Sequence, residues 1–223
     1  MRISDKEIEE KVKEQLRWDD RINDINIFVS ARDGNIKVYG SISSYYAKKL
    51  VTENAKKING VSSIENDLKV RYLPVPEKGL PSDKELENNI KVALELNVSI
   101  NASKISVEVN KGIANLEGTV DAYWKKDIVE SIVSGFNGII DIVNKIAIIH
   151  MGHEDEKIAE DIIGTLDRYR NVNVNDIKIA VEDGKVSISG KVSDWEAYDA
   201  AMDAIHHTHG VNDIKDNLII ASM

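Results

Sequence analysis

Hydrophobic residues in this chain follow two alternating spacings, and the same order of spacings occurs three times. Near the N-terminus a four-residue stride through Ile8, Val12 and Leu16 predicts an amphipathic helix. An alternation of period two follows over residues 27–31 and again over 36–38, which is typical of strands with one buried face. Each repeat is therefore expected to begin with a helix and a β-hairpin.

A second helix and a third strand complete the pattern. Ser43, Asp121 and Ser193 stand at equivalent positions where a helix N-cap is expected. Gly60 and its counterparts are interpreted as the C′ residues that end this helix. Alternating apolar residues between 61 and 70 then predict the last strand.

Three glycines fix the register of the repeat. Gly34, Gly40 and Gly60 recur with a shift of 78 at Gly112, Gly118 and Gly138, and with a further shift of 72 at Gly184, Gly190 and Gly210. The first glycine of each set lies in a predicted tight hairpin turn, since Asp-Gly and Asn-x-Gly supply positive φ at little cost. The second is interpreted as a site where a helix lies close across the sheet.

The predicted fold class is α+β, with three tandem α-β-β-α-β units, each a three-stranded sheet with two helices packed on one face. Unit 1 spans 1–72, a proline-rich linker spans 73–82, unit 2 spans 83–150 and unit 3 spans 151–223. All three prolines fall in the first linker, which is expected to be stiff and extended. The second linker is shorter, so unit 1 is expected to reorient more freely than the other two.

Composition and charge narrow the function. The chain has 223 residues and no cysteine, which excludes disulfides and thiol chemistry. It shows neither a secretory signal nor an apolar run long enough to span a membrane, so a cytoplasmic protein, peripheral to the membrane if it binds one, is expected. The net charge is −9, with 14 basic and 12 acidic residues in unit 1, 7 and 10 in unit 2, and 7 and 15 in unit 3. No nucleic-acid partner is expected, because such proteins usually carry a basic footprint.

Candidate catalytic and metal-binding residues are sparse. No Gly-x-Ser-x-Gly motif is present and no histidine precedes residue 150, so neither an enzyme nor a cofactor is predicted. Asp33, Asp183 and Asp213 lack the spacing of a calcium-binding loop. The weak candidates for a transition-metal site are the five histidines, which also suit a linker and a helix end: His150, His153, His206, His207 and His209.

The repeat resembles the BON domain, a bacterial α-β-β-α-β module. The resemblance lies in the return strand that ends in glycine, Ile36-Lys37-Val38-Tyr39-Gly40, and in the ending Gly60-Val61-Ser62-Ser63-Ile64-Glu65-Asn66-Asp67-Leu68. Both recur in units 2 and 3, although Asp216 replaces the usual asparagine in unit 3. The resemblance implies binding to a phospholipid surface or to another envelope or stress protein, under osmotic stress. Proteins with similar domains also include a cytoplasmic potassium-binding protein, so a monovalent cation is an alternative ligand. A protein scaffold without a lipid or ion ligand is a third hypothesis.

Aromatic and basic residues around the second helix are the predicted lipid or partner contacts. Amphipathic rings favour membrane interfaces and lysines favour anionic headgroups. The candidates are Tyr45, Tyr46, Lys48, Lys49, Lys56, Lys57, Tyr123 and Trp124. The alternatives are a solvated helix face for the lysines and, for Tyr45, Tyr123 and the equivalent Trp195, rings that pack the helix onto its sheet. Unit 3, being acidic, is expected to be repelled from an anionic surface.

Overall fold

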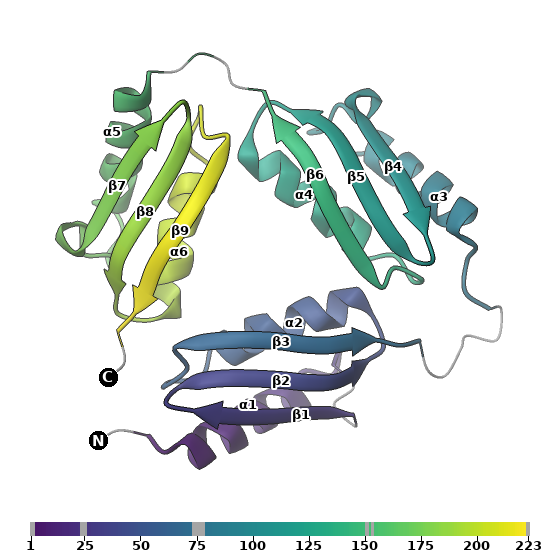
Figure 1. Cartoon of the computed structure of the whole chain (residues 1–223), viewed down its shortest axis with the longest axis horizontal. Helices are drawn as coiled ribbons and strands as arrows, with labels where there is room; N and C mark the ends of the chain where they lie inside the picture. Colours follow the sequence, from purple (N-terminus) through teal and green to yellow (C-terminus); the bar gives the residue numbers. More distant parts are fainter. Residues whose placement is uncertain (1–2, 23–25, 73–78, 150–151, 153, 222–223) are drawn as a thin grey trace.

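A computed structural model describes residues 3–22, 26–72, 79–149, 152 and 154–221 as three units of the same topology (Figure 1). Unit 1 contains α1 (Asp5–Trp18), β1 (Ile27–Arg32), β2 (Asn35–Ile42), α2 (Tyr45–Lys56) and β3 (Ser63–Val70). Unit 2 contains α3 (Asp83–Glu95), a short 3₁₀ turn (Ala102–Lys104), β4 (Ile105–Asn110), β5 (Ile113–Val120), α4 (Tyr123–Ser134) and β6 (Asp141–Ile148). Unit 3 contains α5 (Asp155–Leu166), a second 3₁₀ turn (Val174–Asp176), β7 (Ile177–Glu182), β8 (Lys185–Val192), α6 (Trp195–His206) and β9 (Asp213–Ile220). The predicted fold class is confirmed.

In each unit the second strand lies in the middle of the sheet. β2 pairs antiparallel with β1, where Val29 lies opposite Val38, and parallel with β3, where Ile36 lies beside Ile64. A parallel neighbour cannot be reached through a tight turn, so α2 serves as the crossover between β2 and β3. The sheets of units 2 and 3 repeat this order and register.

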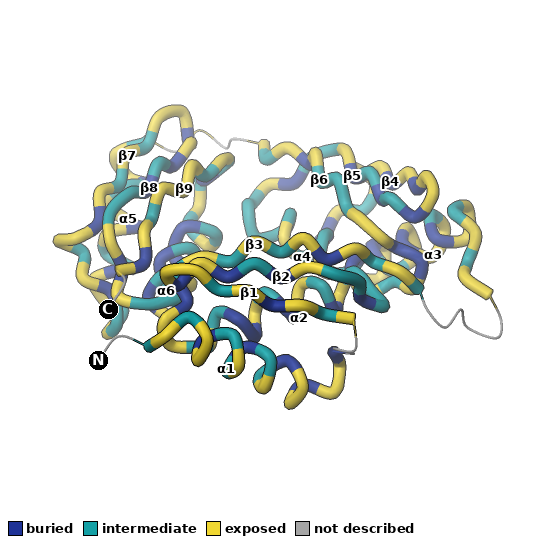
Figure 2. The backbone as a smooth tube through the Cα atoms, turned by 60° about the horizontal axis from the view of Figure 1, so that its bottom comes forward, coloured by how far each residue is buried: buried dark blue, intermediate teal, exposed yellow. Residues whose placement is uncertain are grey.

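The helices cover only one face of each sheet. The predicted stride on α1 is buried, with Ile8, Val12 and Leu16 each at most 2% exposed. The corresponding residues of the other units are buried as well: Leu86, Ile90, Leu94, Ile158, Ile162 and Leu166. The three sheets turn their uncovered faces to the same side of the molecule and the helices lie on the other side (Figures 1 and 2). The chain is therefore a flat two-layer body with a sheet side and a helix side.

The first two glycines of each set satisfy different constraints. Asp33 and Gly34 have φ of 50° and 79°, so both central residues of the hairpin turn are left-handed, as a type I′ turn requires. The interpretation of Gly40 as a contact with a helix is wrong. A Cβ at Gly40 would lie 2.1 Å from the carbonyl oxygen of Asn26, on the segment that leads into β1. Gly118 and Gly190 meet the corresponding carbonyl oxygens at 2.0 Å.

The ends of the second helix differ from the prediction. The N-caps are Ser44, Ala122 and Asp194, one residue later than expected, and Asp194 accepts a hydrogen bond from the backbone N–H of Ala197 at 2.8 Å. α2 ends at Lys56, so Gly60 lies beyond its C′ position. Gly60 instead has φ of 95°, a backbone conformation that residues with a side chain rarely adopt, and a Cβ there would also lie 2.9 Å from Cδ1 of Ile8 on α1.

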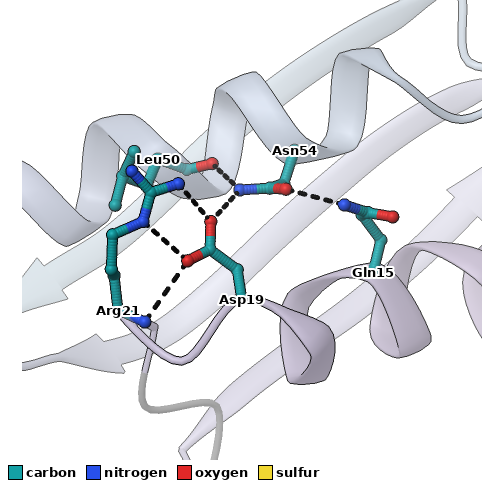
Figure 3. A network of polar contacts seen from close by, with 5 residues as sticks. All are labelled: Gln15, Asp19, Arg21, Leu50 and Asn54. Carbon is teal, nitrogen blue, oxygen red and sulfur yellow. Dashed lines mark hydrogen bonds and ion pairs between the residues drawn. The ribbon is translucent and has the colours of Figure 1, made fainter.

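A polar network found in unit 1 joins α1 to α2 (Figure 3). Asp19, only 4% exposed, accepts hydrogen bonds from the Arg21 guanidinium at 2.8 and 2.7 Å and from the Asn54 side-chain amide at 2.8 Å. Asn54 also donates to the Leu50 carbonyl and accepts from Gln15. The Arg21 guanidinium holds the pKa of the Asp19 carboxyl far below its usual range.

We expect Asp19→Ala to lower the free energy of unfolding at pH 7 by about 2 kcal/mol, because it removes hydrogen bonds to a buried charge. Since the folded-state pKa of Asp19 is lowered, its stabilisation is present above the ordinary pKa of about 3.9 and is lost as pH falls through the folded value. Urea unfolding should show that the free energies of unfolding of wild type and Asp19→Ala differ less at pH 2.5 than at pH 7. The control is Asp20→Ala, which changes the exposed neighbouring aspartate. If the free energies of unfolding of wild type and Asp19→Ala differed equally at both pH values, this assignment would be contradicted.

Candidate functional site

The three units close into a ring, and each pair of neighbouring units meets at a seam (Figure 1). An aromatic residue opens the second helix of every unit: Tyr45 on α2, Tyr123 on α4 and Trp195 on α6. Tyr45 packs against the core of unit 2, Tyr123 against that of unit 3, and Trp195 against that of unit 1. The contact runs from each unit to the next in one rotational sense, so the third contact closes the ring.

The seam between units 3 and 1 has the most complete set of contacts. The Trp195 indole Nε1 donates a hydrogen bond to the Val61 carbonyl oxygen at 2.9 Å. The Lys56 ammonium lies 5.1 Å from the centre of the Trp195 ring and 2.8 Å from a carboxylate oxygen of Asp199. Unit 3 is thus attached to unit 1 by apolar, cation–π and ionic contacts at once.

The seam between units 2 and 3 uses equivalent positions with different chemistry. The Tyr123 and His206 rings lie 4.6 Å apart, and His206 Nδ1 lies 2.8 Å from a carboxylate oxygen of Asp127. Burial at this seam raises the pKa of the Tyr123 hydroxyl. Asp127 and His206 occupy the positions of Asp199 and Lys56, so one ion-pair geometry serves two seams.

The seam between units 1 and 2 varies this arrangement. Burial raises the pKa of Tyr45 to about 12. Lys49 Nζ lies 3.4 Å from a Glu130 carboxylate oxygen. The Tyr72 hydroxyl donates to the Ile139 carbonyl oxygen at 2.7 Å, and this carbonyl is equivalent to the one that Trp195 contacts on Val61.

The predicted contact residues do not gather on one surface. Tyr45, Tyr123, Lys49 and Lys56 lie at the seams. Tyr46 is 43% exposed, and Trp124 lies 5.4 Å from the Lys125 ammonium. The residues left outside these contacts are Lys48 and Lys57, half-buried and exposed respectively. The alternative that these rings pack within their own unit holds for Trp195, which contacts the core of unit 3 as well as that of unit 1, whereas Tyr45 and Tyr123 pack against the next unit. A repeat pattern does not show such contacts between units.

The predicted histidine site has no counterpart among the described residues. His150 and His153 lie outside them, His206 contacts Asp127 at a seam, and His207 lies 3.1 Å from Asp203 on its own helix. No group of three or more histidine, aspartate or glutamate side chains placed to hold a metal ion occurs in the part of the chain that the structure describes.

Unit 1 contacts both of the other units. Unit 1 contacts unit 2 through Tyr45 and Tyr72, and unit 3 through Lys56 and the Val61 carbonyl. Residues 73–78 of the linker that is expected to be stiff and extended lie outside the described residues, so the freedom of unit 1 to reorient stays a prediction.

Charge in unit 3 is divided between the two layers. Helices α5 and α6 carry seven acidic residues and one lysine, whereas β7, β8 and β9 carry four lysines and three acidic residues. Lys178, Lys191 and Lys215 are exposed on the uncovered face of the sheet and form no ion pair with another described residue. Ile219, 60% exposed, lies beside Lys191 in the sheet. Because unit 3 is acidic as a whole, its net charge does not reveal that the uncovered face of its sheet is basic.

Unit 1 contributes an aromatic pair to the same side. Phe28 and Tyr39 lie opposite each other on β1 and β2, are 54% and 44% exposed, and stack with ring centres 5.5 Å apart. Both occupy outward positions of the strand alternation, where polar residues are usual. That departure is visible in the sequence. We call Phe28, Tyr39, Lys178, Lys191, Lys215 and Ile219 the sheet-side patch.

These units are α-β-β-α-β modules that associate side by side. The chain belongs to the BON domain family, which matches residues 4–72, 82–149 and 154–222. It is similar to osmotically-inducible protein Y of Escherichia coli (strain K12), with 28% identity over 143 residues that cover 64% of this chain and 71% of that protein.

Solved structures show only weak overall similarity. CdsD, a structural protein of the type III secretion system of Chlamydia trachomatis, is 11% identical with a TM-score of 0.27, covering 95% of this chain and 91% of that chain. Its C-terminal domain gives the same identity and TM-score, covering 98% and 100%. Separately, none of the helices in the described ranges is both long and apolar enough to cross a bilayer.

We expect Trp195→Ala to open the seam between units 3 and 1, because it removes the half-buried ring and the hydrogen bond to Val61 together. Small-angle X-ray scattering should show a larger radius of gyration while the far-ultraviolet circular dichroism stays unchanged. Trp18→Ala is the matched control, since Trp18 is 77% exposed at the end of α1. An unchanged radius of gyration in Trp195→Ala would contradict the role of this ring in closure.

Proposed function

We propose that this chain is a non-enzymatic protein of the osmotic-stress response that associates with anionic phospholipid surfaces through its sheet side. The observation that carries the proposal is the exposed set Lys178, Lys191 and Lys215, which lacks ion-pair partners among the described residues. Similarity to an osmotically-inducible protein supports the physiological setting.

The sheet-side patch has the composition that interfacial binding needs. Lysines near an anionic membrane contribute about 1 kcal/mol each, and aromatic rings favour the headgroup region. Phe28 and Tyr39 lie on unit 1 and the lysines on unit 3, so a bilayer would contact two units of one flat face. The acidic helices α5 and α6 lie on the opposite side, away from the lipid (Figure 2).

The positions of the lysines are particular to unit 3. The residues equivalent to Lys178 are Ser106 and Phe28, those equivalent to Lys191 are Thr119 and Ser41, and those equivalent to Lys215 are Val143 and Glu65. The fold does not require lysine at these outward positions, because the same module forms in units 1 and 2 without it.

Co-sedimentation with vesicles containing phosphatidylglycerol tests this proposal. We expect wild-type binding at low salt that weakens as salt rises, because surface charge is screened. Reversing the three lysines together (Lys178→Glu, Lys191→Glu, Lys215→Glu) should weaken binding by about a hundredfold or more.

The matched control reverses three lysines on the helix side, Lys13→Glu, Lys84→Glu and Lys91→Glu, which changes the net charge equally. Binding lost equally in both triple variants would show attraction by net charge alone. No sedimentation of the wild type at low salt would overturn the proposal.

If the chain binds potassium instead of lipid, its thermal stability should depend on the cation present. A chain stabilised by potassium should melt at a higher temperature in potassium chloride than in sodium chloride at equal ionic strength, through ligand linkage. Equal melting temperatures together with vesicle binding would favour the lipid function. Selective stabilisation without vesicle binding would favour the cation.

A further inference from the structure

The first strand of every unit is an edge of its sheet. Among the described strands, β1, β4 and β7 pair on one side only, with β2, β5 and β8 respectively. Strand β7 lies on the outer side of unit 3, farther from units 1 and 2 than β9 does (Figure 1). The unpaired backbone groups of an edge strand can pair with another chain, so proteins usually block them.

Units 1 and 2 block this edge with a glutamate from the first helix. The Glu9 carboxylate on α1 accepts a hydrogen bond from the backbone N–H of Ala31 on β1 at 2.9 Å. The Glu87 carboxylate on α3 accepts one from the backbone N–H of Val109 on β4 at 3.1 Å. Both N–H groups point away from the neighbouring strand, so each glutamate occupies a place where a further strand would pair.

Unit 3 has no such glutamate. The residue equivalent to Glu9 and Glu87 is Ala159 on α5, whose methyl group accepts no hydrogen bond. The backbone N–H of Val181, equivalent to those of Ala31 and Val109, has no acceptor among the described residues. The outer edge of β7 is therefore open to pairing.

The apolar side chains along β7 are also less covered than those of β4. Val107 and Val109 on β4 are buried, at 3% and 6% exposure. The equivalent residues Ile179 and Val181 on β7 are half-buried. A strand added beside β7 would cover these two side chains as well as pair with their backbone groups.

The charges on β7 favour a second copy of β7 as that strand. Lys178 and Glu182 are exposed on the uncovered face, two residues to either side of Ala180, and neither forms an ion pair with another described residue. Antiparallel pairing about a two-fold axis at Ala180 places Lys178 of each copy opposite Glu182 of the other. In this register Ile179 and Val181 exchange the ladder hydrogen bonds, and opposite charges in such cross-strand pairs are stabilising.

The other two edges do not offer this complementarity. The same two-fold register on β4 would place Glu108 opposite its own copy, and like charges in that position are destabilising. On β1 it would place Phe28 opposite Arg32. The charge pattern that suits self-pairing is thus found on the edge that no glutamate blocks.

We infer that two copies of this chain associate through their β7 strands, which joins the two sheets of unit 3 into one six-stranded sheet. Because cross-strand partners share a face, the uncovered sheet faces of both copies lie on the same side of the dimer. Lys191 and Lys215 lie on β8 and β9, outside the pairing. Each strand has six residues, so the interface is small and the association is weak and concentration-dependent.

Sedimentation velocity of the full chain without lipid tests this inference. The wild type should shift from monomer towards dimer as its concentration rises. Ala159→Glu supplies the carboxylate that units 1 and 2 carry and should weaken dimerisation by about tenfold or more, because it blocks the Val181 N–H. Lys178→Glu should weaken it by about tenfold, since like charges then face each other twice. Lys178→Glu combined with Glu182→Lys should restore dimerisation, because opposite charges again face each other.

The control is Lys91→Glu on α3, which changes the net charge as Lys178→Glu does and should dimerise like the wild type. Far-ultraviolet circular dichroism checks that each variant is folded. A wild type that stays monomeric up to about 500 µM would overturn the inference, since even weak pairing is populated there. So would wild-type dimerisation of Ala159→Glu, or a double variant that dimerises no better than Lys178→Glu. The assay contains no lipid, so its result is independent of vesicle binding.

Discussion

The structure of the whole chain depends on one aromatic side chain inserted from each unit into the edge of the next. A unit of about seventy residues has a modest core, so an additional half-buried ring is a substantial part of what holds it. Tyr45, Tyr123 and Trp195 give each unit such a ring from a neighbour. Ion pairs accompany the rings, but exposed pairs contribute little individually, and the apolar contact is the main attraction.

Because the ring closes in one rotational sense, surfaces at the seams are distinct from the uncovered faces of the sheets. The second helices contribute their first turns to the seams, which leaves Tyr45 half-buried while Tyr46, Lys49 and Lys57 stay exposed. The uncovered sheet faces remain free on one side, and there the side chains differ among units although the backbone does not (Figure 1). Repetition therefore explains the architecture, and the departures from repetition identify candidate binding residues: Phe28 and Tyr39 in unit 1 and Lys178, Lys191 and Lys215 in unit 3.

Most of the fold could be predicted from the sequence, because alternation, helical stride and glycine spacing are local signals that occurred three times in register. The ends of the second helices were displaced by one or two residues, since capping depends on side-chain direction, as Ser44 shows in place of Ser43. The seams could not be predicted, because nothing local to Tyr45 says whether its ring packs within its own unit. The net charge of unit 3 did not predict its basic sheet face, because the acidic residues of the helices outnumber the lysines that lie on the other layer.

The ring has a consequence for the order of its parts. Each seam joins the second helix of one unit to the following unit, and the seam between units 3 and 1 uses the same first-turn aromatic position as the two that linkers span. Ile3 and Ile220 line one cavity, so the first and last described elements are neighbours in space. A gene in which the three units are circularly permuted should therefore encode the same closed ring, since connectivity specifies only which seam lacks a peptide link.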